Sequence, residues 1–322
     1  MLTLAMLPTT HVDAVVASVQ SNSAAARSRL VASWRRSMLS HGLDPSHKEP
    51  QARLSERDVT DRRDALGRVM QIAAPQLDRL FELVGSSGCG VVLTDCDGVV
   101  VDSRVTEADQ TVFEEWGLGL GAVWSEAVEG TNGIGTCITE ERAVTIHRND
   151  HFMARNTAMS CIDAPIFGAD GHLIAALDVS SARSDQTHAI NGLIAEMVSR
   201  MARTIEVDNF RSNYAQTRIV VADHDDSASS MLLAVDGDDV VVGATRGARK
   251  AYGLETQGAF TPMAASDLFG RGDGPVGFEK AERAAVVRAL VRANNNVSVA
   301  ARDLAVSRAT LYRRMKRLGL TE

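Results

Sequence analysis

The chain has 322 residues, enough for roughly two or three compact domains that each bury a core. With 45% hydrophobic and 23% charged residues, its composition excludes a wholly disordered protein. No apolar run approaches the ~20 residues of a membrane-spanning helix. The N-terminal residues also lack the basic region and cleavage site of a secretory signal, so we expect a cytoplasmic protein.

The net charge of -7 is distributed unevenly along the chain. Residues 280–322 contain ten Lys or Arg and three Asp or Glu side chains, a net charge of +7, which leaves -14 on residues 1–279. A basic terminal segment next to an acidic remainder is typical of a module that contacts nucleic-acid phosphates.

The N-terminal half begins with helical patterns and then changes to short β-branched runs. Helical spacing predicts one helix over residues 12–40, with Trp34 among its apolar positions, and a second over residues 58–84. The stretches GVVLTDCDGVVVDSR and APIFGADGHLIAALDVSS then each predict a strand, an Asp-Gly turn and a strand. We expect an α+β fold, with an antiparallel sheet covered by helices.

A long helix is predicted over residues 186–214. Its apolar stripe consists of Ile190, Leu193, Ile194, Met197, Val198, Met201 and Ile205. We expect this stripe to pack on the chain's own sheet, and a role between subunits remains open. Beyond it, MLLAVDGDDVVVGATRGARKAYGLE predicts strand, acidic turn, strand and short helix, and FGRGDGPVG predicts a linker.

Three helical stretches follow the linker. The inward positions are expected to be Ala284, Val287, Leu290 and Val291 in the first stretch, Ala300, Ala301 and Leu304 in the second, and Leu311, Met315 and Leu318 in the third. Ser298 and Ser307 are the predicted N-caps of the second and third helices. Two short helices, the second with a basic outer face, fit the major groove of DNA.

NVSVAARDLAVSRATLYRRMKRLGL resembles the Fis-type helix-turn-helix of bacterial regulators over about forty residues. Ala305 departs from this pattern, which favours glycine in the turn. The resemblance implies a recognition helix whose DNA contacts come from Ser307, Arg308, Thr310, Tyr312, Arg313, Arg314, Lys316 and Arg317. Since one such module covers few base pairs, we expect a homodimer on an inverted repeat of double-stranded DNA.

The glycine-rich stretch around Thr131 lacks the lysine and the strand-to-helix context of a phosphate-binding loop. With its surroundings it resembles the GAF sensor domain of AcoR-like acetoin-catabolism regulators, over roughly residues 25–212. The residues that carry the resemblance are Trp124-Ser125-Glu126, Gly130 through Thr136, His151-Phe152, Cys161, Pro165-Ile166 and Leu177-Asp178. GAF domains enclose small molecules, and the candidate ligand-lining residues are Trp124, Glu129, Thr131, Asn132, Thr136, His151, Cys161 and Asp163.

Most members of that family place an ATPase domain between the sensor and the DNA-binding segment. This sequence contains no G-x-x-x-x-G-K-[ST] motif and has only about 65 residues between the two modules. The string Gly258-Ala259-Phe260-Thr261 is similar to the sigma-contacting loop of those ATPases, but Pro262 replaces the expected glycine, and we interpret the similarity as chance. We therefore expect regulation without ATP hydrolysis, by recruiting or blocking RNA polymerase.

Other functions are less well supported by the residues. No nucleophile-base-acid set or dinucleotide motif indicates an enzyme, and no cofactor is expected. A metal sensor using His147, His151, Cys137 and Cys161 lacks standard spacing, and a thiol sensor through Cys161 or a constitutive nucleoid-type DNA-binding protein remain alternatives. We expect N-terminal helices over residues 1–84, a GAF sensor of a small metabolite over 85–212, a short PAS-like segment or linker over 213–272, and a DNA-binding domain over 277–322.

Overall fold

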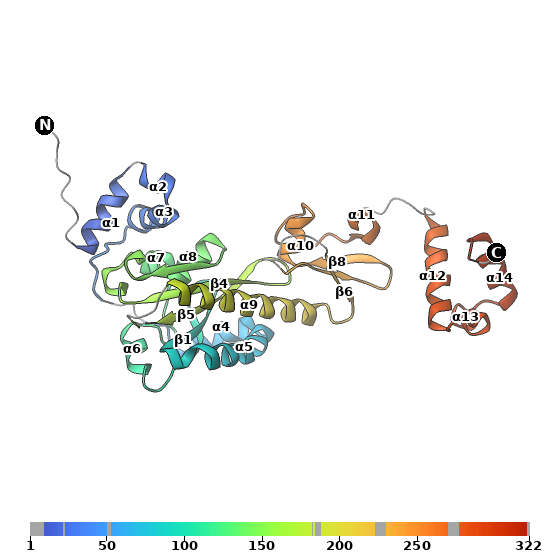
Figure 1. The fold of residues 1–322 in the computed structure, drawn as a ribbon, viewed down its shortest axis with the longest axis horizontal. Coiled ribbons are helices and arrows are strands. Elements are labelled where there is room, and N and C mark those ends of the chain that lie inside the picture. Colours follow the sequence, from blue (N-terminus) through green and yellow to red (C-terminus); the bar gives the residue numbers. More distant parts are fainter. Residues whose placement is uncertain are drawn as a thin grey trace. The chain divides into compact units, whose positions relative to one another are not determined.

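A computed structural model of the protein describes residues 10–21, 23–49, 53–181, 183, 188–222, 230–269 and 277–320. The chain divides into two compact units, residues 1–263 and residues 264–322 (Figure 1). The linker predicted over residues 269–277 lies almost wholly outside the described residues. None of the helices in the described part is long and apolar enough to cross a membrane.

The N-terminal region consists of shorter helices than the sequence predicts. They are α1 (His11–Gln20), α2 (Ala24–Arg27), α3 (Arg29–Arg35) continuing into a π-helical segment (Arg36–Ser40), α4 (Glu56–Leu66) and α5 (Arg68–Val84). Ser28 ends α2 and caps α3, accepting a hydrogen bond from the Val31 N–H. Gly67, at φ +52°, separates α4 from α5. The prediction of two continuous helices was wrong because a capping serine and a left-handed glycine interrupt the apolar periodicity.

The centre of the first unit is a five-stranded antiparallel sheet in the order β2-β1-β5-β4-β3. Its strands are β1 (Cys89–Asp95), β2 (Val100–Arg104), β3 (Val144–His147), β4 (Ser160–Phe167) and β5 (Leu173–Ser181). The two predicted hairpins are confirmed as β1-β2 and β4-β5, with Gly98 and Gly171 at positive φ in their turns.

Helices cover both faces of this sheet (Figure 1). Val91, Leu93 and Ile162 pack in one cluster with α5 and with α9 (His188–Asn213). Val92 and Cys161 lie on the opposite face, because side chains alternate along a strand. The shorter helices on that opposite side are α6 (Gln110–Glu115), α7 (Glu126–Glu129) and α8 (Gly133–Glu140). Single 3-10 turns lie at Gly85–Ser87, directly after α5, and at Arg148–Asp150 and Ala154–Asn156.

The predicted stripe on α9 is only partly buried. Ile194, Val198 and Ile205 pack against the sheet as expected. Ile190 and Leu193 remain 43% and 69% exposed. The helix therefore covers the chain's own sheet and leaves an apolar edge uncovered near its N-terminal end.

A second, four-stranded sheet follows α9, in the order β6-β7-β8-β9. Its strands are β6 (Arg218–Val221), β7 (Leu232–Val235), β8 (Val240–Ala244) and β9 (Met263–Ala264), and α10 (Arg246–Ala251) follows β8. The buried Arg249 of α10 donates to the carbonyl oxygens of Ala244 and Gly258, both at 2.9 Å. The segment that resembles a sigma-contacting loop is thus fixed against the chain's own helix.

The second unit contains α11 (Ala265–Phe269), α12 (Phe278–Arg292), α13 (Val297–Asp303) and α14 (Arg308–Arg317). Leu311, Met315 and Leu318 are buried as predicted. The predicted inward face of α12 was partly wrong: Leu290 packs against the core as predicted, but Val286 and Ala289 are the buried residues, and Val291 is 68% exposed. Alanine and valine occupy most sides of this helix, so apolar spacing alone does not define its buried face.

Candidate functional sites

The helix-turn-helix of the second unit is built by local signals. The Asn296 side chain accepts from the Ser298 and Val299 N–H groups at 3.1 and 3.3 Å, so Asn296 rather than the predicted Ser298 caps α13. Ser307 caps α14 as predicted, accepting from the Thr310 N–H at 3.1 Å. Ala305 lies in the turn at φ +50°, the left-handed conformation that favours the glycine of the Fis-type pattern.

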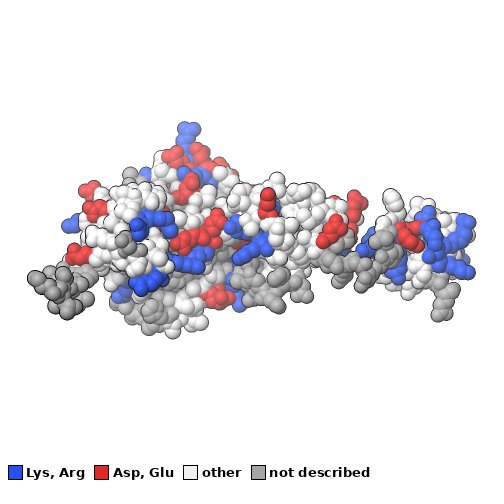
Figure 2. Space-filling view, turned by 90° about the horizontal axis from the view of Figure 1, so that it is seen from above, with Lys and Arg blue, Asp and Glu red and all other residues white. Residues whose placement is uncertain are grey.

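The outer face of α14 presents a basic surface. Figure 2 shows Lys and Arg side chains gathered on the C-terminal helices. Arg308, Arg313 and Lys316 are exposed, and the Arg308 guanidinium lies 5.6 Å from the centre of the Tyr312 ring. These groups are free to reach phosphates and base edges, because the apolar positions of the helix face inward.

Two of the predicted DNA-contacting arginines have a partner within the unit. Arg314 lies 3.3 Å from the Glu282 carboxylate of α12, and Arg317 also pairs with Glu282. All three are at least partly exposed, so these pairs contribute little stability. DNA contact by either arginine would compete with this carboxylate.

In the region predicted as a GAF sensor, called the sensor below, the glycine-rich segment forms a close contact between α8 and the sheet. A Cβ atom on Gly133 would lie 2.0 Å from an Asp163 carboxylate oxygen, and one on Gly135 would lie 2.4 Å from the Glu126 nitrogen. Asn132 caps α8 by accepting from the Gly135 N–H at 2.8 Å. The glycines are therefore required for close packing, which explains the motif without a phosphate ligand.

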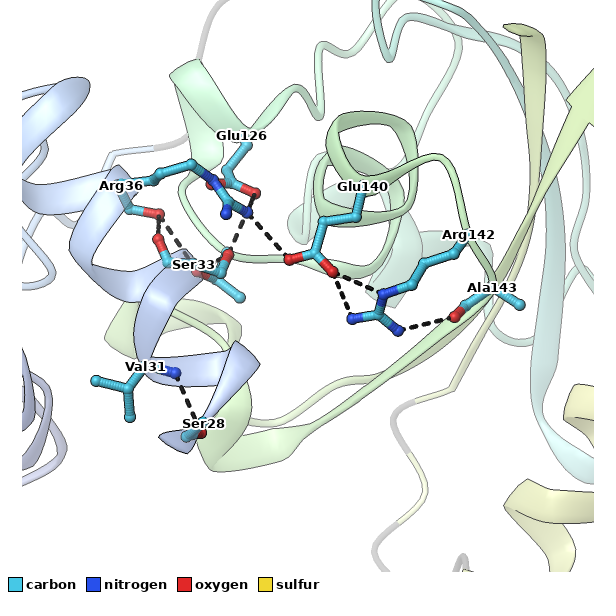
Figure 3. Close-up of polar contacts among 10 residues, drawn as sticks. Ser28, Val31, Ser33, Arg36, Glu126, Glu140, Arg142 and Ala143 are labelled. Carbon is cyan, nitrogen blue, oxygen red and sulfur yellow. Dashed lines mark hydrogen bonds and ion pairs between the residues drawn. The ribbon is translucent and has the colours of Figure 1, made fainter. Parts of the chain in front are cut away.

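A network of polar side chains joins the N-terminal helices to α7 and α8 (Figure 3). Arg36 donates to both oxygens of the buried Glu126 carboxylate, at 2.8 and 3.0 Å, and to Glu140 at 3.3 Å. Arg142 lies on the other side of Glu140, at 2.5 Å. The Ser33 hydroxyl donates to Glu126 at 3.2 Å and lies 2.7 Å from the Thr131 hydroxyl. The N-terminal helices thus form one wall of the sensor.

Beside this network lies a cavity of about 130 Å³ between α3, α8 and β3. Thr131 and Thr136, two of the predicted ligand-lining residues, both line it. The Thr136 hydroxyl is buried and has no hydrogen-bond partner among the described residues. The other lining residues are Arg29, Leu30, Ser33, Glu140, Arg142, Val144, Thr145, Ile146 and Asp150. The cavity combines apolar walls, hydroxyl groups and one buried hydroxyl available to a ligand.

Three other predicted ligand-lining residues already have partners in the protein. The Trp124 indole N–H donates to the Gly117 carbonyl at 2.9 Å. Glu129 is buried and accepts from Arg155 at 2.6 Å. Asn132 donates to the Trp124 and Gly130 carbonyls in addition to capping α8. These contacts hold the loop that carries Thr131 and the start of α8, the helix that carries Thr136.

The remaining candidates belong to a buried polar cluster beneath α8. His151 Nε2 lies 3.4 Å from Cys161 Sγ, and Ser180 Oγ lies 3.2 Å from the same sulfur and 2.8 Å from an Asp178 oxygen. Asp163 and Asp178 are register partners on β4 and β5. The carboxyl oxygens of Asp163 are buried, and they have no partner other than the adjoining Asp178 carboxyl within the described part of the chain.

Burial sets the protonation of this cluster. It raises the pKa of Asp178 to about 7 and, together with the neighbouring Asp178, raises the pKa of Asp163 well above its usual range. Burial lowers the pKa of His151 to about 4, so the imidazole is neutral near pH 7. The pKa of the Cys161 thiol is raised by the same cause, which disfavours the reactive thiolate.

The described residues do not form a metal centre, since no three His, Cys, Asp or Glu side chains among them are arranged to hold an ion. His147 instead lies 2.6 Å from the Ser160 hydroxyl through its Nδ1 atom. Cys137 and Cys161 are buried free thiols, Cys96 is an exposed one, and Cys89 is buried. The burial of Cys161 disfavours a thiol sensor at this residue.

Sequence reasoning missed Ser33, Arg36 and Asp178 as parts of the sensor. Ser33 and Thr131 are 98 positions apart in the sequence, so no spacing links them. Asp178 gave a signal, because it belongs to the Leu-Asp pair of the AcoR-like pattern and lies opposite Asp163 in the predicted hairpin.

Comparison with known proteins is consistent with this architecture. Residues 12–200 match the family described as the MimR N-terminal domain, and residues 277–318 match the Fis family of bacterial regulatory proteins. The chain is 34% identical over 231 residues to the acetoin catabolism regulatory protein of Cupriavidus necator, covering 70% of this chain and 35% of that protein. It is 31% identical over 144 residues to the propane 2-monooxygenase operon transcriptional activator MimR of Mycolicibacterium smegmatis, covering 44% of this chain and 23% of that protein.

Among solved structures, the chain resembles one in the E. coli DhaR(N)-DhaL complex. The TM-score is 0.52 at 12% sequence identity, over 74% of this chain and 80% of that one, which shows a shared fold. The chain spans about a third or less of the length of the curated relatives it matches.

Proposed function

The chain belongs to the family of the MimR N-terminal domain and carries a Fis-family helix-turn-helix, and on this basis we propose that it is a DNA-binding transcriptional regulator whose sensor binds a small metabolite. The observation that carries the proposal is the presence, in one chain, of an exposed basic recognition helix and a sensor cavity lined by an unpartnered buried hydroxyl. Its function is regulation rather than catalysis.

The size and lining of the cavity define the class of effector. A cavity of about 130 Å³ holds a molecule of about six heavy atoms. Thr131, Thr136 and Ser33 offer hydroxyl groups, and Leu30 and Ile146 offer apolar contact. This favours a small alcohol, aldehyde or hydroxyketone such as acetoin. The relatives named for acetoin and propane metabolism lead to the same class.

A matched pair of threonine variants tests this effector site in the full chain. Thr136→Val removes the cavity hydroxyl and keeps the side-chain shape. A lost hydrogen bond of about 1 kcal/mol weakens effector binding about fivefold. Thr94→Val is the control. The Thr94 hydroxyl is also buried on the same face of the sheet and has no partner in the described ranges of the chain, but it lies outside the lining of this cavity.

Effectors are identified by the shift in Tm that acetoin, propan-2-ol or short aldehydes cause. The affinity of the protein for operator DNA is then measured with and without each compound. Equal affinities of the Thr136→Val and Thr94→Val proteins for an active compound would place its site elsewhere. If no compound changes either Tm or operator affinity, the protein is a constitutive DNA-binding protein and the sensor proposal is wrong.

We propose that the protein binds an inverted repeat as a homodimer. A single helix-turn-helix reads few base pairs, which favours two modules per site. The exposed Ile190 and Leu193 of α9 offer an apolar surface to a second copy of the chain. Leu193→Asp should convert a dimer to monomers in light scattering and weaken operator binding. A wild-type monomer that occupies one half-site would contradict the dimer.

The same proposal includes regulation without ATP hydrolysis. The sequence contains no G-x-x-x-x-G-K-[ST] motif, and about 65 residues lie between the sensor and the helix-turn-helix. The protein would then recruit or block RNA polymerase directly. Purified protein should show no ATP turnover above a buffer control with or without operator DNA. DNA-stimulated hydrolysis would overturn this part of the proposal.

A further inference from the structure

A cleft in the first unit lies where the sensor meets the second sheet. It has a volume of about 720 Å³ and shares only Arg142 with the lining of the small cavity beside α3. Ala164, Pro165 and Phe167 of β4 and Ala202 of α9 give it an apolar wall. This volume falls in the range of ordinary ligand sites, about 300–1,000 Å³.

Arg246, at the start of α10, fixes one side of the cleft. Its guanidinium donates to the Gly171 carbonyl at 3.1 Å, pairs with Glu141 at 2.5 Å and lies 4.5 Å from the centre of the Phe167 ring. The Gly258 N–H donates to the Asp170 carbonyl at 2.9 Å. The β4-β5 turn is thus held to the loop after α10, and the two sheets are joined along the cleft.

The charges around the cleft favour an anion. Its lining contains four cations, from Arg142, Arg203, Arg246 and Lys250, and three carboxyl groups, from Glu141, Glu196 and Glu206. Arg246 pairs with Glu141, Arg203 lies 3.3 Å from Glu196, and Arg142 pairs with Glu140 outside the lining. Lys250 is exposed, and its side chain has no hydrogen bond or ion pair to any described residue.

Glu206 does not cancel this positive charge at neutral pH. It accepts from the Phe167 N–H at 2.9 Å. Burial raises the pKa of Glu206 to about 7, although the positive charges of Arg203 and Arg246 lower it in part. A large part of the Glu206 population is therefore uncharged at pH 7 and does not offset the positive charge of Lys250.

We propose that this cleft binds a small carboxylic acid anion with an apolar body. The carboxylate meets Lys250 and Arg246, and the apolar body lies against Phe167 and Pro165. A monoanion fits better than a phosphate ester, because Lys250 is the one cation of the described lining without a carboxylate partner and a second negative charge would have none to meet. Because it contacts both β4 and α10, such a ligand strengthens the joint between the sensor and the second sheet. This inference is independent of the effector cavity at Thr136.

The test uses the full chain and two pairs of probes that differ in charge. Benzoate and hexanoate are compared with benzyl alcohol and hexan-1-ol by calorimetric titration at pH 6.5 and low salt. The carboxylates should bind with saturation and the alcohols at least about fivefold more weakly. Lys250→Gln should weaken benzoate binding about three- to fivefold, the size expected for a partly exposed ion pair.

Two control variants distinguish binding in this cleft from binding elsewhere on the chain. Lys48→Gln removes an exposed lysine from the same unit but outside the cleft and should leave benzoate affinity unchanged. Ser199→Phe fills the cleft from α9 and should abolish binding without loss of Tm. Equal binding of acid and alcohol, an unaltered Lys250→Gln titration, or no saturable carboxylate binding up to about 10 mM would each overturn the proposal.

Discussion

The two units each use a glutamate to hold arginine side chains, in opposite settings. Glu126 in the sensor has a side chain that is only 1% exposed, and it contacts Ser33 and Arg36 from an N-terminal segment about ninety residues earlier. Glu282 in the DNA-binding unit is 23% exposed and contacts Arg314 and Arg317 on the surface. The sensor is thus stabilised by buried polar contacts between distant segments, whereas the DNA-binding unit relies on a small apolar core and local caps.

The largest expected effect comes from Glu126→Ala, which is compared with Glu282→Ala in the other unit. Glu126→Ala leaves Arg36 with only Glu140 and leaves the Ser33 hydroxyl without this acceptor. The free energy of unfolding of the sensor should fall by about 3 kcal/mol, below the upper range for a buried ion pair because Arg36 is a third exposed. Glu282→Ala should lower that of its unit by less than about 1 kcal/mol.

Chemical denaturation of the two variants measures both values. If Glu126→Ala and Glu282→Ala lower the free energy of unfolding by similar amounts, the proposed contrast between a buried and a surface glutamate is wrong. Glu282→Ala should in addition free Arg314 and Arg317 for DNA, so its operator affinity should stay the same or rise at low salt.

The pH dependence of stability should also differ between the units. Glu206 of the sensor has a pKa of about 7 in the folded protein against an ordinary value of 4.5. The folded state therefore holds this proton more tightly than the unfolded state. The resulting stabilisation is complete below about pH 4.5 and is lost as the pH rises through about 7.

Glu206→Gln keeps an acceptor for the Phe167 N–H and removes this titration. Between pH 5 and 8, the free energy of unfolding of the wild-type sensor should fall by about 1–2 kcal/mol more than that of the variant. This value is smaller than the full pKa difference implies, because the Glu206 side chain is partly exposed. Parallel pH profiles for the two proteins, measured by urea unfolding, would show that Glu206 titrates normally.

DNA binding should separate residues that read bases from residues that neutralise phosphate. Arg308→Ala should cost about 1–3 kcal/mol and relax sequence preference at one operator position, since arginine reads guanine with two hydrogen bonds. Lys316→Ala should weaken binding similarly for all sequences and reduce the salt slope by about one. Binding titrations against single-base operator variants at several salt concentrations give both readouts. A uniform loss from Arg308→Ala would assign Arg308 to the phosphate contacts.

The comparison also explains what could be predicted from the sequence. The cap at Ser307 and the inward residues Leu311 and Met315 depend on neighbours within a few turns, so local patterns identified them. Asp-Gly turns identified the hairpins for the same reason. The inward face of α12 was only partly identified, through Leu290, because Val286 and Val287 are equally apolar and only the packing of α13 and α14 selects Val286.

The sensor site was less predictable because it is assembled from distant segments. Family resemblance led to Thr131 and Thr136, but the wall they face comes from Ser33 and Arg29 on an early helix. Chemical type also failed to distinguish roles. Asn132 and Glu129 have the polar groups of ligand contacts, yet they cap a helix and pair with an arginine.

The smallest expected effect concerns the turn between the two helices that bind DNA. Ala305 is exposed and adopts φ +50°, where a Cβ atom is unfavourable. Ala305→Gly should raise the free energy of unfolding by about 0.5–1 kcal/mol, because relief of this strain exceeds the added flexibility of the unfolded chain. Ala309→Gly, at an exposed position within α14, should lower it by about the same amount. Urea unfolding should therefore show that the same Ala→Gly substitution changes the free energy of unfolding in opposite directions at the two positions. The backbone conformation alone determines the sign. Destabilisation by both would mean that Ala305 has an ordinary right-handed conformation and that the turn departs from the Fis-type geometry.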